Sequence, residues 1–390
     1  MLSSYYATFA GFIERQAARR WYPVKLVGFI LLLACAFQPP PWQTMLYYDS
    51  VYPQDDSLLG RFRSQVAHPF TAPSSPPASH QAKTTFRLVP PLLTRALHTG
   101  LFGLYLAQVL IGGVMYWALY RLLRDELTDP VAATVLTTGT ALTYFGYACL
   151  YDFLFFDAIG YAGLVLLLYV RQPVGLTLLT IVAGFTDERA LLASLLPMFW
   201  HATAAYRHQP AASSTSPLWL RFNWQVGAIG LGWVGYGLLR SGLALHFHLP
   251  THLDAVGLDV LRRNAEWQAI QLGFVSALKS YWVFIALFLA VLIGHRRYGV
   301  ALLFVGCLLP VGLGAFLVFD ITRSLAYVFP AAIISVVLLR RDLSRRSFSQ
   351  LTLTVSLLAA LITSGHVVNG VFYPAGSLPA LLVTWLGPPG

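Results

Sequence analysis

Charged residues are scarce in this sequence, and cysteines are few. Asp, Glu, Lys and Arg make up 11% of the 390 residues, whereas a typical soluble domain contains about 25%. Cys35, Cys149 and Cys307 lie within apolar runs and form no CxxC pair, so they indicate neither a zinc site nor a disulfide framework. These shortages argue against both an ordinary soluble domain and a disulfide-stapled one.

The signatures of several enzyme classes are also missing. The sequence contains no GxSxG, no HExxH and no kinase-like set of motifs. One apolar run is rich in glycine but follows no strand and lacks the lysine of a phosphate-binding loop, so we interpret its glycines as helix-packing positions. These are Gly227, Gly230, Gly232, Gly235 and Gly237.

Apolar residues dominate instead. They make up 57% of the chain, the mean hydropathy is +0.63, and apolar runs bounded by Pro, Gly or charged residues recur along its length. This pattern predicts an all-α, polytopic membrane protein with about eleven crossings, within a range of about nine to twelve. The predicted crossings are 24–37, 97–122, 132–150, 153–170, 174–185, 190–205, 222–245, 272–294, 300–319, 325–339 and 351–363. The first run follows a basic stretch, but no A-x-A cleavage site follows it, so we interpret it as a membrane helix.

The distribution of charge predicts an orientation. The net charge is +10, but the basic residues lie mostly at the ends of apolar runs, which argues against nucleic-acid binding. An amino terminus in the cytoplasm places most Lys and Arg in short inner loops, as the positive-inside rule requires. It leaves few acids inside, and the rest of the sixteen lie outside or at the outer boundary. The inner acids are Glu14, Asp125, Glu126, Asp129 and Asp342.

Two connections stand out within what we interpret as a single transmembrane domain, residues 1–390. Residues 38–96 form a large first outer loop that we expect to contain a small interfacial lobe, and residues 206–221 read as a flexible cytoplasmic linker. Each cytoplasmic segment is about twenty-five residues or shorter, which is too short for a nucleotide-binding βαβ domain. A nucleotide-sugar donor is therefore disfavoured.

Several acids and arginines lie near the outer ends of apolar runs, where buried charge is costly and often functional. Glu188 and Arg189 lie in the turn Thr186-Asp187-Glu188-Arg189 between two short runs, and Asp320 and Arg323 are spaced to share a helical face. Arg87 precedes the second crossing. The arginines are candidates for binding a phosphate, although local ion pairs and a snorkelling anchor are the simpler interpretations.

Two further carboxylates are candidate catalytic groups. Asp49 follows the first helix, and Asp152 lies with Asp157 near an outer turn among aromatic residues. With Glu188, they could deprotonate an acceptor hydroxyl while arginines neutralise a phosphate leaving group. The aromatic setting could instead mark the interfacial belt. His246, His248 and His252 lack well-spaced ligand pairs, so we predict no metal site and no cofactor, leaving a divalent ion open.

Taken together, these segments resemble multi-pass bacterial glycosyltransferases of the GT-C type. The resemblance is carried by the acids after the first helix, Phe86-Arg87-Leu88-Val89-Pro90, Asp187-Glu188-Arg189-Ala190-Leu191 and Asp320-Ile321-Thr322-Arg323. It implies transfer of a sugar from a polyprenyl-phosphate lipid to an acceptor at the outer face of the bacterial inner membrane. By position, Asp49 would activate the acceptor, and Arg87 and Arg323 would hold the donor phosphate.

Two other function classes stay open. A proton-coupled transporter or lipid-linked sugar flippase would use buried acids as proton relays and a broken helix as the substrate path, which the 186–189 turn fits. The charges cluster at one face, however, and no second broken helix is evident in the sequence. In a non-catalytic membrane scaffold, the acid and arginine pairs would only fix helix ends.

Overall fold

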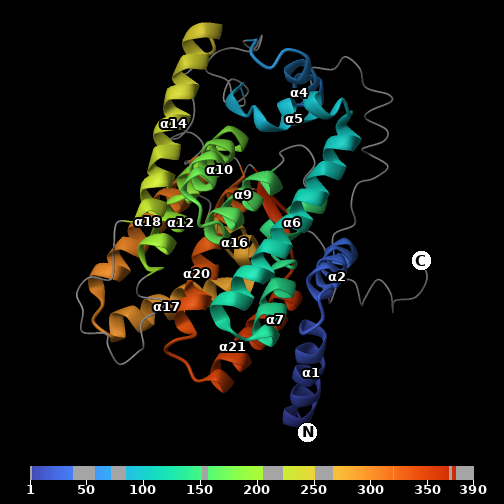
Figure 1. Ribbon diagram of the computed structural model, residues 1–390, viewed down its shortest axis with the longest axis vertical. Coiled ribbons are helices and arrows are strands. Elements are labelled where there is room, and N and C mark those ends of the chain that lie inside the picture. Colours follow the sequence, from blue (N-terminus) through green and yellow to red (C-terminus); the bar gives the residue numbers. More distant parts are fainter. Residues whose placement is uncertain are drawn as a thin grey trace.

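A computed structural model describes residues 2–37, 58–71, 85–151, 157–204, 223–250, 267–318, 320–368 and 371–374. Nearly all of them lie in helices, which confirms the predicted helical fold (Figure 1). The exception is an antiparallel hairpin of β1 (Gly365–Val368) and β2 (Val371–Pro374), in which His366 pairs with Tyr373. The predicted linker 206–221 lies outside the described residues.

Each predicted crossing contains helix. The amino-terminal half comprises α1 (Leu2–Ala17), α2 (Tyr22–Phe37), α4 (Leu58–Ala67), α5 (Val89–Leu97), α6 (Leu101–Leu127), α7 (Pro130–Thr140), α8 (Tyr144–Tyr151), α9 (Asp157–Tyr169), α10 (Pro173–Thr186), α11 (Glu188–Ala193) and α12 (Leu195–Ala202). The other half comprises α14 (Trp224–Phe247), α16 (Trp267–Leu278), the 3₁₀ turn η3 (Lys279–Tyr281), α17 (Trp282–Gly294), α18 (Tyr298–Phe316), α19 (Ile321–Ala326), α20 (Phe329–Leu339) and α21 (Arg345–Leu361).

Five of the described helices are long and apolar enough to cross a membrane, as expected of a membrane protein. They are Leu101–Leu127, Trp224–Phe247, Ile270–Gly294, Tyr298–Phe316 and Ile321–Leu339. Large apolar side chains such as Leu110, Leu231 and Leu302 are exposed on their surfaces, where a membrane would cover them. Ile321–Leu339 differs because its apolar window is wholly buried, so it lies inside the bundle.

Several apolar runs are interrupted where the sequence predicts continuous crossings. Residues 132–150 divide into α7 and α8, and 272–294 is broken at Lys279, whose backbone φ is 51°. Before and within the first break, the hydroxyls of Thr137, Thr140 and Thr143 donate to carbonyls three or four residues earlier. Such bonds compete with regular helical bonding, which explains why composition alone does not reveal the break.

The close pairing of α10 and α14 depends on glycine. A Cβ at Gly184 would lie 2.7 Å from Tyr236 Cδ2, and one at Gly232 would lie 2.5 Å from Thr180 Cβ. The packing role predicted from the sequence is therefore confirmed at Gly232, but no atom lies within 4 Å of a Cβ built at Gly230. The two helices run side by side (Figure 1), and Arg240 in the carboxyl-terminal half of α14 lies near Glu188, just after the end of α10.

Ion pairs between described residues fall into two groups at opposite ends of the bundle. One group lies near α1 and the loops that the sequence places inside: Arg345 with Glu14 and Asp129, Arg171 with Glu126, and His295 with Asp342. The other group joins residues that the sequence places outside, and it includes Arg87, Asp187 and Arg323. The described part of residues 38–96 forms α4 and α5, which contact each other at the end opposite α1 (Figure 1).

Candidate functional site

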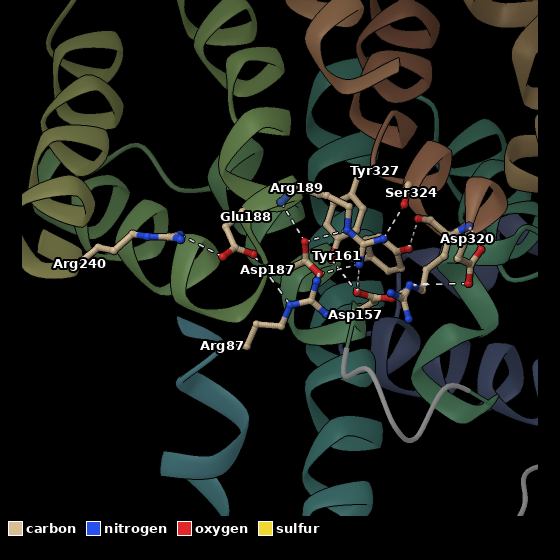
Figure 2. Close-up of polar contacts among 11 residues, drawn as sticks. Arg87, Asp157, Tyr161, Asp187, Glu188, Arg189, Arg240, Asp320, Ser324 and Tyr327 are labelled. Carbon is tan, nitrogen blue, oxygen red and sulfur yellow. Dashed lines mark hydrogen bonds and ion pairs between the residues drawn. The ribbon is translucent and has the colours of Figure 1, made fainter. Parts of the chain in front are cut away.

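The ends of several helices converge on a cluster of acids and arginines (Figure 2). Arg87 precedes α5, and Asp157 begins α9. Asp187, Glu188 and Arg189 lie at the junction of α10 and α11. The remaining charged members are Arg240 on α14, and Asp320 and Arg323 at the start of α19. The cluster thus joins segments that lie far apart in the sequence.

Asp187 organises the junction between α10 and α11. It ends α10, and as the N-cap of α11 its Oδ1 accepts from the backbone N–H of Arg189 at 2.9 Å. The same carboxylate accepts from the Arg189 guanidinium, with Nε 2.8 Å from Oδ1 and Nη2 2.5 Å from Oδ2. Arg87 Nη2 adds an ion pair 3.1 Å from Oδ2. The turn therefore has the local Asp187–Arg189 pair that the sequence suggests, and it also binds an arginine from another segment.

Asp157 is the most deeply buried acid of the cluster, with no exposed side-chain surface. Its Oδ1 accepts from Arg189 Nη2 at 2.9 Å and from the Tyr327 hydroxyl at 3.0 Å. Its Oδ2 lies 2.9 Å from Arg323 Nε. Asp157 therefore links the turn at Arg189 to α19.

Asp320 and Arg323 form the start of α19. Asp320 is the N-cap, and its Oδ1 accepts from the backbone N–H of Arg323 at 3.0 Å, while the Arg323 Nε lies 3.8 Å from Oδ2. The Tyr161 hydroxyl donates to the Arg323 carbonyl at 2.9 Å. Arg189 Nη1 donates to the Ser324 hydroxyl at 2.6 Å. These contacts fix α19 against α9 and α11.

Glu188 lies at the more exposed edge of the cluster, between two arginines (Figure 2). Arg240 Nη1 donates to Glu188 Oε1 at 3.0 Å, and Arg87 Nε lies 3.9 Å from Oε2. The side chains of Glu188, Arg240 and Arg87 are 34%, 24% and 18% exposed, against 1% for Asp187. The cluster therefore has a buried, hydrogen-bonded interior and an accessible edge.

The charges of the interior compensate one another. Burial alone would raise the pKa of Asp187, but the guanidiniums of Arg189 and Arg87 outweigh it and hold the pKa well below its usual value. Asp187 is therefore ionised at neutral pH, and its charge offsets the neighbouring arginines. A buried ion pair of this kind is costly to break because the remaining charge has no solvent.

The hairpin brings a histidine near the same cluster. The backbone N–H of Val367 donates to the Thr322 hydroxyl at 3.0 Å, which ties β1 to α19. Burial lowers the pKa of the adjacent His366, with Asp320 acting to raise it and Arg323 to lower it. Nothing in the sequence links this histidine to residues 320–323, so its place beside the cluster is not predictable from the sequence.

Five of the predicted site residues come together in this cluster, namely Arg87, Glu188, Arg189, Asp320 and Arg323. Asp49 and Asp152 lie outside the described residues. Asp157, which the sequence analysis above places near an aromatic turn, lies at the buried centre of the cluster. Arg240 is a further member of the cluster that is not among the predicted site residues, although a lone arginine within an apolar run is itself a signal.

No group of three or more His, Cys, Asp or Glu side chains suited to a metal ion occurs in the described part of the chain. His252, one member of the histidine group noted in the sequence, lies outside that part. The charged groups of the cluster are carboxylates and guanidiniums. Such a set can accept a proton and bind a phosphate group.

Comparison with known proteins gives no relative: no family model, curated protein or solved structure matches the chain.

Proposed function

We propose that the chain is a membrane glycosyltransferase that moves a sugar from a polyprenyl-phosphate carrier to an acceptor at the extracytoplasmic face. The observation that carries the proposal is the accessible Glu188 carboxylate between the guanidiniums of Arg87 and Arg240, 3.0 Å from Arg240 Nη1 and 3.9 Å from Arg87 Nε. A carboxylate beside arginines supplies a proton acceptor and a phosphate-binding group at one place. The resemblance of the chain's charged segments to GT-C glycosyltransferases supports the same assignment.

The reaction requires a simple exchange of bonds. The acceptor hydroxyl oxygen attacks the anomeric carbon of the sugar, and its proton passes to the Glu188 carboxylate. The bond between the anomeric carbon and the phosphate oxygen breaks, and the polyprenyl phosphate leaves with the bonding electrons. Attack opposite the leaving group inverts the anomeric configuration. Arg87 and Arg240 stabilise the charge that develops on the departing phosphate.

The proposed setting is the bacterial inner membrane, with about eleven crossings and the amino terminus in the cytoplasm. In this orientation the cluster lies toward the outer face, where the phosphate of a polyprenyl carrier is presented. The ion pairs Arg171–Glu126 and Arg345–Asp129 lie at the other end of the bundle. Their segregation from the cluster supports the assignment of the two groups to opposite faces.

Reconstitution tests the proposal directly. The purified protein in vesicles is given radiolabelled polyprenyl-phosphate sugars and candidate acceptors, and transfer is compared between wild type, Glu188→Gln and Glu126→Gln. Glu126 is a matched control because it also pairs with an arginine, 3.1 Å from Arg171 Nη2, at the other end of the bundle. Glu188→Gln is expected to lower turnover by about a hundredfold or more, and Glu126→Gln to leave it near wild type. Equal turnover in the two variants would remove Glu188 from the mechanism.

A transporter or flippase is the second candidate, favoured by the number of helix breaks. The α10–α11 and α18–α19 junctions both lie at the charge cluster, and Lys279 marks another break. Interrupted helices lining a polar path are typical of transporters. Proton-coupled uptake of a solute or movement of a lipid-linked sugar in the same vesicles, without transfer from any donor, would favour this function. A scaffold would show neither activity.

A further inference from the structure

Arg87 and Arg240 approach the same carboxylate from different segments of the chain. Arg87 directly follows Phe86, and the Arg240 guanidinium lies 4.3 Å from the centre of the Phe86 ring. Arg240 Nη1 also donates to the Tyr236 hydroxyl at 2.6 Å. Stacking and hydrogen bonding therefore hold the Arg240 fork in place beside Glu188, as a preorganised anion site requires.

Glu188 satisfies this pair of arginines only in part. Its Oε1 lies 3.0 Å from Arg240 Nη1, a good charge-assisted hydrogen bond, but its Oε2 is 3.9 Å from Arg87 Nε, which is too long for one. Arg87 Nε is buried and has no hydrogen-bond acceptor among the described residues. A buried donor without an acceptor calls for a further partner.

The other arginines of the cluster are less available to a ligand. Arg189 is 11% exposed and holds Asp187, Asp157 and the Ser324 hydroxyl. Arg323 is 7% exposed and pairs with Asp157. An incoming anion would have to displace buried carboxylates from these two arginines. At the edge it has to displace only the accessible Glu188, because Arg87 pairs with the buried Asp187 through Nη2 and turns Nε toward Glu188.

We propose that Arg87 and Arg240 form a phosphate-binding pair whose anion position is occupied by the Glu188 carboxylate until a phosphate group displaces it. A phosphate offers more acceptor oxygens than a carboxylate and can engage both guanidiniums at once, including Arg87 Nε. Binding then releases Glu188 from the arginines, and the freed carboxylate can take up a proton. The lipid identity of the phosphate rests on the proposed function, but the exchange of anions does not.

Binding of two probes tests the exchange without any transfer reaction. The full-length protein in detergent is titrated with a short polyprenyl monophosphate and, separately, with inorganic phosphate. Glu188→Gln removes the competing anion and is expected to bind the lipid phosphate at least about fivefold more tightly, whereas Arg240→Gln is expected to bind it at least about fivefold more weakly. Glu126→Gln and Arg171→Gln, the matched pair at the other end of the bundle, are expected to bind it as wild type does.

The Glu188→Gln result decides the proposal, because misfolding does not produce tighter binding. Unchanged or weaker binding by this variant would overturn the displacement, and unchanged binding by Arg240→Gln would remove Arg240 from the site. If Arg240→Gln does not fold, Arg240→Lys keeps the charge but loses the fork, and weaker binding is again expected. If Glu188→Gln binds inorganic phosphate more tightly by the same factor, this result would overturn a lipid as the source of the phosphate group. If Glu188→Gln binds the lipid phosphate more tightly but the wild-type protein transfers no sugar, the transferase proposal would be refuted and the anion site would stand.

Discussion

Asp157 Oδ2 lies 2.9 Å from Arg323 Nε, and the two side chains are 0% and 7% exposed. The pair joins the first residue of α9 to α19, two helices that are far apart in the sequence. Because Asp157 also accepts from Arg189 and Tyr327, it connects the two charged turns that the sequence presents separately. The accessible edge at Glu188 therefore rests on a buried and mutually compensated interior.

Replacing Asp157 should destabilise the protein strongly. Asp157→Asn keeps the shape of the side chain but removes the charge that Arg189 and Arg323 face, and breaking a buried ion pair costs about 3 to 5 kcal/mol. The apparent Tm in detergent measures the effect. Asp125→Asn is the control, because the Asp125 carboxylate is about half exposed in its pair with Arg124 and such pairs contribute about 1 kcal/mol or less. Equal Tm values for the two variants would contradict the role given to Asp157.

Replacing a glycine of α14 by alanine should be tolerated at Gly230 but not at Gly232, where α14 packs closely against α10. Gly232→Ala places a Cβ 2.5 Å from Thr180 Cβ, so we expect the two helices to separate and Arg240 to shift relative to Glu188. We expect the free energy of unfolding to fall by about 1 to 3 kcal/mol and the phosphate probe to bind more weakly. Gly230→Ala on the same helix meets no atom within 4 Å, and it should be neutral or stabilising by up to about 1 kcal/mol. Thermal unfolding of both variants checks the contrast, which would fail if both lost stability equally.

Lowering the pH should destabilise the folded protein because Asp187 becomes protonated. Burial raises the folded-state pKa of Asp187, but Arg189 and Arg87 lower it by more, so this pKa lies below its usual value. The stability it contributes is therefore fully present above the unfolded pKa of about 4 and is lost as pH falls below that value. Lowering the pH from about 6 to about 3 should reduce the apparent Tm less in Asp187→Asn than in Asp125→Asn. The same fall in both variants would show that another group is responsible.

The orientation of the chain can be tested by labelling single cysteines in a variant whose three cysteines are replaced by alanine. We expect His98→Cys, at the end of α5, to react with a membrane-impermeant maleimide added to intact spheroplasts. Arg171→Cys and Arg345→Cys should react only after permeabilisation. All three positions are exposed, so reactivity reports the side of the membrane. The reverse pattern would invert the proposed topology.

The sequence predicts the helical class and much of the charge cluster because both follow from local properties. Apolar runs of sufficient length must be helical in a membrane, and charges at their ends, as in Asp187-Glu188-Arg189, are costly enough to mark a site. The helix breaks are less predictable because threonine side chains and positive φ at Lys279 act through backbone bonding. The hairpin is also missed, since four-residue strands give little alternation.

The members missed in the sequence depend on tertiary contacts. Arg240 is fifty-two residues from Glu188, and only the close approach of α10 and α14 at Gly184 and Gly232 brings the two together. Asp157 lies among aromatic residues that equally suggest an interfacial belt. Its burial becomes evident only when Arg189 and Tyr327 are placed around it.

The order in which the chain emerges from the ribosome gives the Asp157–Arg323 pair a consequence for biogenesis. Asp157 and Arg189 are synthesised early, and both are present once α9, α10 and α11 have been made. Arg323 is synthesised only with α19, after α14 to α18. The ion pair between Asp157 Oδ2 and Arg323 therefore forms only after those helices have been made. The polar interior is therefore completed late in synthesis, once Arg323 has been added.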